Sequence, residues 1–362
     1  MINLDREQRK IDHIEYALQT RRAVDNGLSD IRFVHNSLPN TAVSNVNLAV
    51  KMGELSFSSP IFINAMTGGG GNETYKINEG LAEVAKEFGL AMAVGSQMAA
   101  IKNPSERSTF EIVRKVHKDG ILFANLGSEA TVDQAKHAVE MIEANALQIH
   151  LNPVQELVMP EGDRDFTMSL RNIERIVKNV EVPVIVKEVG YGMSKETAEQ
   201  LTNVGVSIVD VGGFGGTNFS SIENKRRNRR LTYFEDWGIS TSASICEVSS
   251  IQSPPFIIAT GGMNDALQTV KALSLGASLV GMAGFVLKIF REQGMEALRA
   301  EMRAFHEDLA FILTALGTET ILDLRHVPLV ISGKTYHWLQ ERMIDTKTYA
   351  NRHKKNRPFR NV

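Results

Sequence analysis

The sequence predicts an α/β fold, a closed (β/α)8 or TIM barrel with an N-terminal arm and extra C-terminal helices. Eight short apolar runs alternate with segments in which apolar residues recur every three or four positions. Such runs are typical of parallel strands buried on both faces. The alternation also fits an open doubly wound sheet, but eight strands over roughly 225 residues is the usual span of a closed barrel.

The expected strands, in chain order, are 60–65, 91–94, 121–125, 146–150, 184–187, 207–211, 256–259 and 278–281. Helical periodicity covers 78–88, 133–143, 194–203 and 264–273, and glycines follow several of these segments, where they can end a helix. We expect an arm and lead-in over 1–55, the barrel over 56–294, and a helical extension over 295–362. Together they form one globular domain.

Composition narrows the class of protein. The 362 residues are 43% hydrophobic and 23% charged, which is typical of a globular protein. The single cysteine, Cys246, excludes an internal disulfide and fits a reducing cytoplasm. A formal net charge of -2 gives no sign of a nucleic-acid partner. Residues 1–12 lack the apolar stretch of a signal peptide, and no run of about 18 apolar residues predicts a membrane span.

Glycine-rich segments follow the last two expected strands, at 259–263 and 281–284. In barrels, the loops after strands seven and eight commonly bind phosphate through backbone amides. Glycine lets those amides approach an anion, and the N-terminus of the next helix adds partial positive charge. Tight turns alone would explain one such loop, whereas two loops at these strands favour a phosphate site.

Small polar groups follow the first three strands, in Ala65-Met66-Thr67-Gly68-Gly69, Gly95-Ser96-Gln97 and Asn125-Leu126-Gly127. Turn chemistry explains each of them separately. Together they form a ring of small hydrogen-bonding groups at one rim. Such a ring is suited to a planar polar cofactor.

The fifth strand ends in a lysine, Lys187. The period of two places it on the same side as Ile185, with Glu188 on the other side. Because an unpaired buried ammonium is costly, Lys187 needs a partner. Negative charge on a reduced flavin, a Schiff base of the aldolase kind and a structural ion pair are the alternatives.

The fourth strand carries the densest polar cluster, in the segment 148–156. His150 and Asn152 share one face of the strand, and Pro153 ends it. Glu156 is suited to holding Mg2+ against a diphosphate, because Mg2+ takes one or two carboxylates plus phosphate oxygens. A rim histidine and a solvated acid are the alternatives, but the density of the cluster favours function.

These segments resemble the type 2 isopentenyl-diphosphate isomerase family, in family order from residue 9 to residue 284. The most specific are the His-x-Asn-x-x-Gln-Glu run at 150–156 and the Gly-Gly-x-Gly-Gly-Thr-Asn run at 212–218. Arg9-Lys10 with His13, the segments 66–69, 95–97 and 187–190, Trp237-Gly238-Ile239 with Thr241, and both glycine loops also match the family pattern.

The resemblance implies an enzyme that interconverts isopentenyl and dimethylallyl diphosphate by adding and removing protons at reduced FMN. It also implies Mg2+ on the diphosphate, NADPH as reductant, and a homo-oligomer whose N-terminal arm reaches a neighbouring site. Implied FMN contacts are Ala65, Met66, Thr67, Gly68, Ser96, Asn125, Lys187 and Thr217, with Gly261, Gly262, Met263, Ala283 and Gly284 around its phosphate. Implied substrate contacts are Arg9, Lys10, His13, His150, Asn152 and Gln155, with Gln155 and Lys187 catalytic and Glu156 on the metal.

Three rival functions are weighed against this one. An FMN-dependent 2-hydroxy-acid oxidase needs a rim histidine and an arginine after strands six and seven, where this chain is rich in glycine. No histidine lies between His150 and His306. Nucleotide chemistry like that of inosine monophosphate dehydrogenase needs a rim cysteine, but Cys246 precedes strand seven. A non-catalytic barrel that binds a phosphate ligand is the third alternative.

Overall fold

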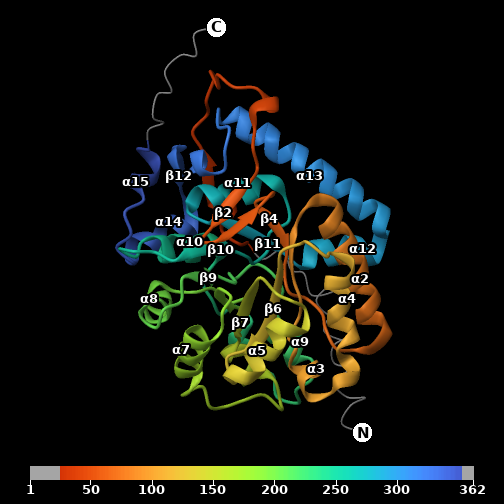
Figure 1. Ribbon diagram of the computed structural model, residues 1–362. Helices are drawn as coiled ribbons and strands as arrows, with labels where there is room; N and C mark the ends of the chain where they lie inside the picture. Colours follow the sequence, from red (N-terminus) through yellow and green to blue (C-terminus); the bar gives the residue numbers. More distant parts are fainter. Residues whose placement is uncertain (1–24, 353–362) are drawn as a thin grey trace.

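A computed structural model describes residues 25–352 and confirms the closed barrel (Figure 1). Eight parallel strands close in the order β10-β11-β4-β5-β6-β7-β8-β9. Every expected strand is present within a few residues of its expected limits. The strands are β4 (Ile61–Ile63), β5 (Ala91–Ala93), β6 (Leu122–Gly127), β7 (Ala146–Leu151), β8 (Val184–Glu188), β9 (Ile208–Asp210), β10 (Phe256–Ala259) and β11 (Leu279–Met282).

Helices follow the strands around the barrel, and α2 (Gly71–Phe88) and α4 (Ser108–Val116) pack side by side on its outside (Figure 1). Helix α2 begins before residue 78, where the sequence predicted its start; the prediction missed its first turns because they are polar and have no apolar period. Gly89, whose φ is 62°, caps the C-terminus of the helix. The other helices of the barrel are α3 (Met98–Lys102), α5 (Val132–Met141), α6 (Pro153–Val158), α7 (Ser169–Asn179), α8 (Lys195–Asn203), α9 (Phe219–Asn224), α10 (Thr241–Ser249), α11 (Ala266–Leu275) and α12 (Gly284–Gln293).

An antiparallel hairpin of β2 (Val50–Met52) and β3 (Leu55–Phe57) precedes the barrel and packs into its interior. The ring of Phe57 lies 6.3 Å from that of Phe123, centroid to centroid. The cluster it joins contains Ile185 and residues of all eight barrel strands, most of them at the first or second position of the strand. The hairpin therefore fills the N-terminal end of the barrel, and the opposite end, where the strands finish, remains for chemistry.

The residues after the barrel form α13 (Met295–Ala315), α14 (Gly333–Glu341) and α15 (Lys347–Ala350). The long α13 packs along α11 and α12 on the outside of the barrel (Figure 1). A short strand, β12 (Leu329–Ile331), also occurs here and pairs with β1 (Ile31–Phe33). It was not expected among helices, because three residues are too short for a reliable period. Across residues 25–352, no helix has the length and apolar character needed to cross a membrane.

Candidate active site

A cleft opens where β4, β8, β9, β10 and β11 end. The space inside it, with the solvent in its open mouth included, is about 860 Å³. Glycines and small residues form most of its wall. Predicted cofactor contacts that line it are Ala65, Lys187, Thr217, Gly261, Gly262, Met263, Ala283 and Gly284.

The glycine-rich segments 212–218 and 259–263 meet inside this cleft, with no room for side chains between them. A Cβ on Gly261 would lie 2.1 Å from the carbonyl oxygen of Gly213, and one on Gly262 would lie 2.3 Å from that of Gly215. Both positions have φ in the left-handed region, 114° and 74°. Glycine is required there by backbone conformation and by close approach alike.

The cleft fits a phosphate-bearing cofactor. The ten-residue helix α12 begins at Gly284 on the cleft wall, so its unpaired N–H groups and partial positive charge are available to an anion. Lys288, one turn further along α12, also lines the cleft. Loops after the last two strands and a helix N-terminus commonly form the phosphate site of such barrels, and Lys288 adds a positive charge to it here.

Substituting Gly261 by alanine is expected to weaken binding of FMN, the cofactor that the family resemblance implies, by on the order of tenfold to a hundredfold. The new Cβ must push the two loops apart, in addition to the roughly 1 kcal/mol cost of a positive φ. Fluorescence titration of FMN measures the affinity. Gly294→Ala is the matched control, since Gly294 has φ 87° and a Cβ added there would have no neighbouring atom within 4 Å. Equal affinities for the two variants would contradict the close-approach argument.

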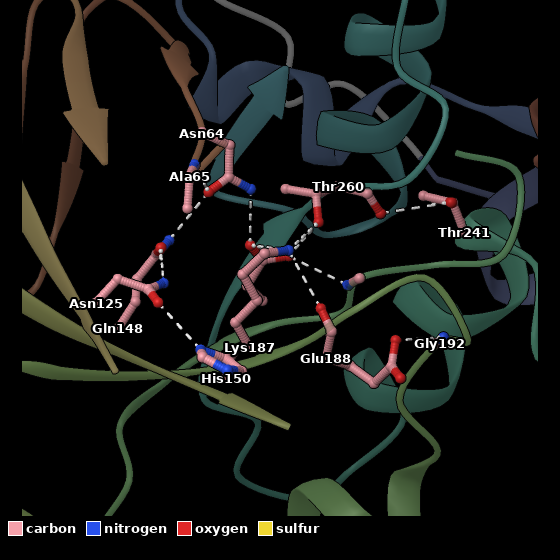
Figure 2. A network of polar contacts seen from close by, with 12 residues as sticks. Asn64, Ala65, Asn125, Gln148, His150, Lys187, Glu188, Gly192, Thr241 and Thr260 are labelled. Atoms are coloured by element: carbon pink, nitrogen blue, oxygen red, sulfur yellow. Dashed lines mark hydrogen bonds and ion pairs between the residues drawn. The ribbon is translucent and has the colours of Figure 1, made fainter. Parts of the chain in front are cut away.

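Lys187 points into the barrel interior, as its period with Ile185 predicts, and lies at the centre of a polar network (Figure 2). Its Nζ pairs with Asp210 Oδ2 at 3.1 Å. It also donates to Thr260 Oγ1 and to the carbonyl of Glu188, each at 3.1 Å. All three ammonium protons thus have acceptors, so an ion pair of the structural kind is present. Its position on the cleft wall still allows contact with a bound ring.

Glu188 faces away from Lys187 and shapes the adjacent loop. Its carboxylate accepts hydrogen bonds from the amides of Tyr191 at 2.6 Å and Gly192 at 3.0 Å. Burial raises the pKa of Glu188 to about 8, although those amides favour the charged form. The carboxyl therefore holds the turn that brings Val189 and Gly190 to the cleft.

His150, on β7, stands opposite Lys187 in the strand register. Its Nδ1 lies 3.0 Å from Asn125 Oδ1. Burial lowers the pKa of His150 to about 4, and the charge of Lys187 acts in the same direction, whereas the backbone carbonyl of Leu126 opposes it. The imidazole is consequently neutral at pH 7.

The second polar group sits on the short helix α6. Asn152 directly precedes the first residue of α6. The side-chain Nδ2 of Asn152 donates to Glu156 Oε1 at 3.0 Å and to Gln155 Oε1 at 3.4 Å. Glu156 Oε2 accepts from the amide of Asp163 at 2.9 Å. Among residues 25–352 no three His, Cys, Asp or Glu side chains gather to hold a metal. A metal at Glu156 would therefore need most of its ligands from a substrate and water.

The predicted FMN contacts Met66, Thr67, Gly68 and Ser96 do not line the cleft. The hydroxyl of Thr67 donates to Asn78, and a Cβ on Gly68 would collide with the ring of Phe110. Met66 and Ser96 are half-buried and outside the cleft wall. Arg9, Lys10 and His13 lie outside the described residues. Cys246 is fully buried in α10, in agreement with its exclusion as a rim nucleophile.

Sequence reasoning missed several residues of this site: Asn64, Gln148, Asp210, Thr260 and Lys288. A signal for three of them was present, because Asn64, Gln148 and Asp210 are polar positions inside apolar runs. A polar side chain within a strand buried on both faces has to meet a partner. Lys288 lies four residues after Gly284, so the helical period puts both near the start of α12.

Comparison with known proteins agrees with this geometry. Residues 106–330 match the profile of the FMN-dependent dehydrogenase family. The chain is 60% identical over 347 residues to an isopentenyl-diphosphate delta-isomerase of Geobacillus sp. (strain WCH70), covering 96% of this chain and 99% of the relative. An enzyme of the same name from Bacillus licheniformis is 57% identical over 349 residues, covering 96% of this chain and 100% of the relative.

Solved structures with the same fold are more distant in sequence. A flavocytochrome b2 variant matches with a TM-score of 0.66 and 18% identity, covering 89% of this chain and 83% of the other. A mandelate oxidase variant with benzaldehyde matches with a TM-score of 0.61 and 14% identity, covering 90% and 95%. At these identities the likeness shows the barrel alone.

Proposed function

This chain belongs to the type 2, FMN-dependent isopentenyl-diphosphate delta-isomerase family, and from that premise we propose that it interconverts isopentenyl and dimethylallyl diphosphate. The observation that carries the proposal is the glycine-lined cleft with Lys187 on its wall. The reaction adds one proton and removes another across three carbons. FMN, when bound in its reduced form, supplies an electron-rich ring that can give and take a proton beside the alkene.

The chain's own residues would bind and orient the reactants. The loops at Gly261, Gly262 and Met263 and at Ala283 and Gly284 would hold the FMN phosphate, with Ala65, Met66, Thr67, Gly68, Ser96, Asn125 and Thr217 around the flavin. Lys187 would place positive charge near the ring, where it favours an anionic reduced form.

The diphosphate would bind on the side of α6. His150, Asn152 and Gln155 would contact the substrate, and Glu156 would hold Mg2+ against its diphosphate oxygens. Arg9, Lys10 and His13 would add positive charge from the N-terminal arm of a neighbouring subunit, so the active form would be a homo-oligomer. A cytoplasmic location would give access to NADPH, which would reduce the flavin for activation.

The direct test is conversion of isopentenyl diphosphate by the purified protein with FMN and Mg2+. With dithionite present, we expect isomerisation; with oxidised FMN alone, we expect none. NADPH should replace dithionite. Equal activity in flavin-free samples would contradict the cofactor role, and oxidation of a 2-hydroxy acid in place of isomerisation would favour the oxidase alternative.

A further inference from the structure

A chain of side-chain hydrogen bonds crosses the barrel interior from Asp210 to His150, and Figure 2 shows its part from Asn64 through Gln148 and Asn125 to His150. Asn64 Nδ2 donates to Asp210 Oδ2 at 3.2 Å, and Gln148 Nε2 donates to Asn64 Oδ1 at 3.2 Å. Asn125 Nδ2 then donates to Gln148 Oε1 at 3.1 Å, and Asn125 Oδ1 meets His150 Nδ1 at 3.0 Å. The three amides and Asp210 are each at most 3% exposed, so water does not compete for them.

In this chain of hydrogen bonds, which group donates and which accepts is fixed at the Asp210 end. Both oxygens of Asp210 face hydrogen-bond donors, since Oδ2 lies 3.1 Å from the ammonium of Lys187 and Oδ1 accepts from the amide of Gly212 at 3.1 Å, so Asn64 must present its NH2 group to Asp210. A second observation fixes Asn64 independently. The backbone N–H of Ala65 points at Asn64 Oδ1 at 2.7 Å, and a backbone N–H cannot accept. The oxygen and nitrogen of this amide are thereby distinguished, which coordinates alone do not do.

Each later amide has only one orientation that avoids a clash of like groups. Gln148 must present its nitrogen to the Asn64 oxygen, so its own oxygen faces Asn125. Asn125 must present its nitrogen to that oxygen, so its oxygen faces the imidazole. An amide oxygen as the last acceptor requires a proton on His150 Nδ1.

We propose that Asp210, acting through Asn64, Gln148 and Asn125, holds His150 in the tautomer protonated at Nδ1 and leaves Nε2 for the ligand. A neutral imidazole has two tautomers, and the chain selects one of them. Asp210 is thus a positioning residue for His150. This selection requires no substrate and is a property of the folded protein.

One consequence rests on the proposed function. A neutral Nε2 carries a lone pair, and an unprotonated diphosphate oxygen carries lone pairs as well. Contact between them therefore requires one proton, on Nε2 or on the diphosphate. The amide oxygen of Asn125 suits either state of the ring, because Nδ1 keeps its proton when Nε2 gains one.

The tautomer can be measured in the full-length protein with FMN bound. Nitrogen-15 labelling of histidine and two-dimensional NMR distinguish protonated from unprotonated ring nitrogens, and the His150→Gln variant identifies the His150 signals. We expect the Nδ1-protonated form in the unaltered protein. In Gln148→Met the side chain keeps its length and loses both hydrogen bonds, so the tautomer ratio should shift by on the order of tenfold.

Two further variants sharpen the test. Gln97→Met is the matched control, because Gln97 is also buried and hydrogen-bonds through both atoms of its amide. Its Nε2 donates to the carbonyl of Ala138, and its Oε1 accepts from the backbone N–H of Asn125. It touches the backbone N–H of Asn125 and not the side-chain amide that bonds His150, so the tautomer should not change. In Gln148→Glu one carboxyl oxygen faces Asn125, and the other must carry a proton to donate to Asn64 Oδ1; in that form the Nδ1-protonated ring should be retained.

An Nε2-protonated ring in the unaltered protein would overturn the proposal, even if Gln148→Met did not fold. An unchanged ratio in folded Gln148→Met would overturn it as well. A protein with the expected tautomer that does not isomerise isopentenyl diphosphate would refute the proposed function and leave the positioning role intact.

Discussion

Replacing Lys187 by methionine is expected to lower turnover by on the order of a hundredfold or more and to lower the midpoint potential of the bound flavin. The ammonium lies 3.1 Å from Asp210, so the pair is close to neutral. Without Lys187, the carboxylate stays and the site gains net negative charge, which disfavours an electron-rich reduced ring. A charge effect of 1.4–3 kcal/mol corresponds to about 30–60 mV for a two-electron couple.

Stability should fall in the same variant. Asp210 is fully buried, and breaking a buried pair by removing one partner costs about 3–5 kcal/mol. Denaturant unfolding measures this loss. In the double variant Lys187→Met with Asp210→Asn, the buried charge is gone, so stability and most of the potential should recover while turnover stays low.

Lys271→Met serves as the control for loss of a half-buried lysine. Its Nζ donates to the carbonyl of Leu28, away from the cleft, so the flavin potential should not change. An unchanged potential with normal turnover in Lys187→Met would leave Lys187 as one half of a structural ion pair. Recovery of turnover in the double variant would mean that net charge, and not contact by the ammonium, matters.

The barrel could be predicted because its strands have a strong local signal. A parallel strand covered on both faces is mostly apolar, and β6, β7 and β8 each begin with apolar residues, at 122–124, 146–147 and 184–186. The period of two placed Lys187 on the same side of its strand as Ile185, and the structure shows that this side is the barrel interior. The start of α2 and the strand β12 were missed, because polar first turns and three-residue strands carry little periodic signal.

The partners of the site residues could not be predicted from local patterns. Lys187 meets Asp210 only because β8 and β9 are adjacent in a register that pairs these two residues. The chain from Asn64 to Asn125 likewise depends on closure, which brings β4 across the interior from β7 and β9. The family resemblance implied which residues contact the ligands. It did not point to this hydrogen-bond network, because the network forms without a ligand and its residues make no recognisable sequence motif.

Replacing Glu156 by glutamine is expected to raise the Mg2+ concentration needed for activity by on the order of a hundredfold. A lone carboxylate binds Mg2+ weakly, so the diphosphate completes the coordination shell and the charge of Glu156 matters most when both are present. Flavin binding should stay near normal, since the FMN phosphate would lie at the ends of β10 and β11. Titration of Mg2+ against initial rate, with FMN affinity measured in parallel, checks both statements.

The local geometry adds one effect that needs a control. Both carboxylate oxygens of Glu156 face donors, Asn152 Nδ2 and the amide of Asp163. A glutamine must turn its own NH2 toward one of them, which disturbs α6 as well as removing charge. Glu156→Asp keeps the charge on a shorter stem and should retain part of the Mg2+ response. If aspartate were as poor as glutamine, position and not charge would be the cause.

Gln155→Ala provides the contrasting variant on the same helix. Its oxygen is 3.4 Å from Asn152 Nδ2, so the substitution leaves the shorter bond from Asn152 to Glu156 in place. If Gln155 contacts the substrate and not the metal, turnover should fall on the order of tenfold to a hundredfold even at saturating Mg2+. Excess Mg2+ should restore activity to Glu156→Gln and not to Gln155→Ala. The opposite pattern, with rescue of the Gln155 variant alone, would require the two roles to be exchanged.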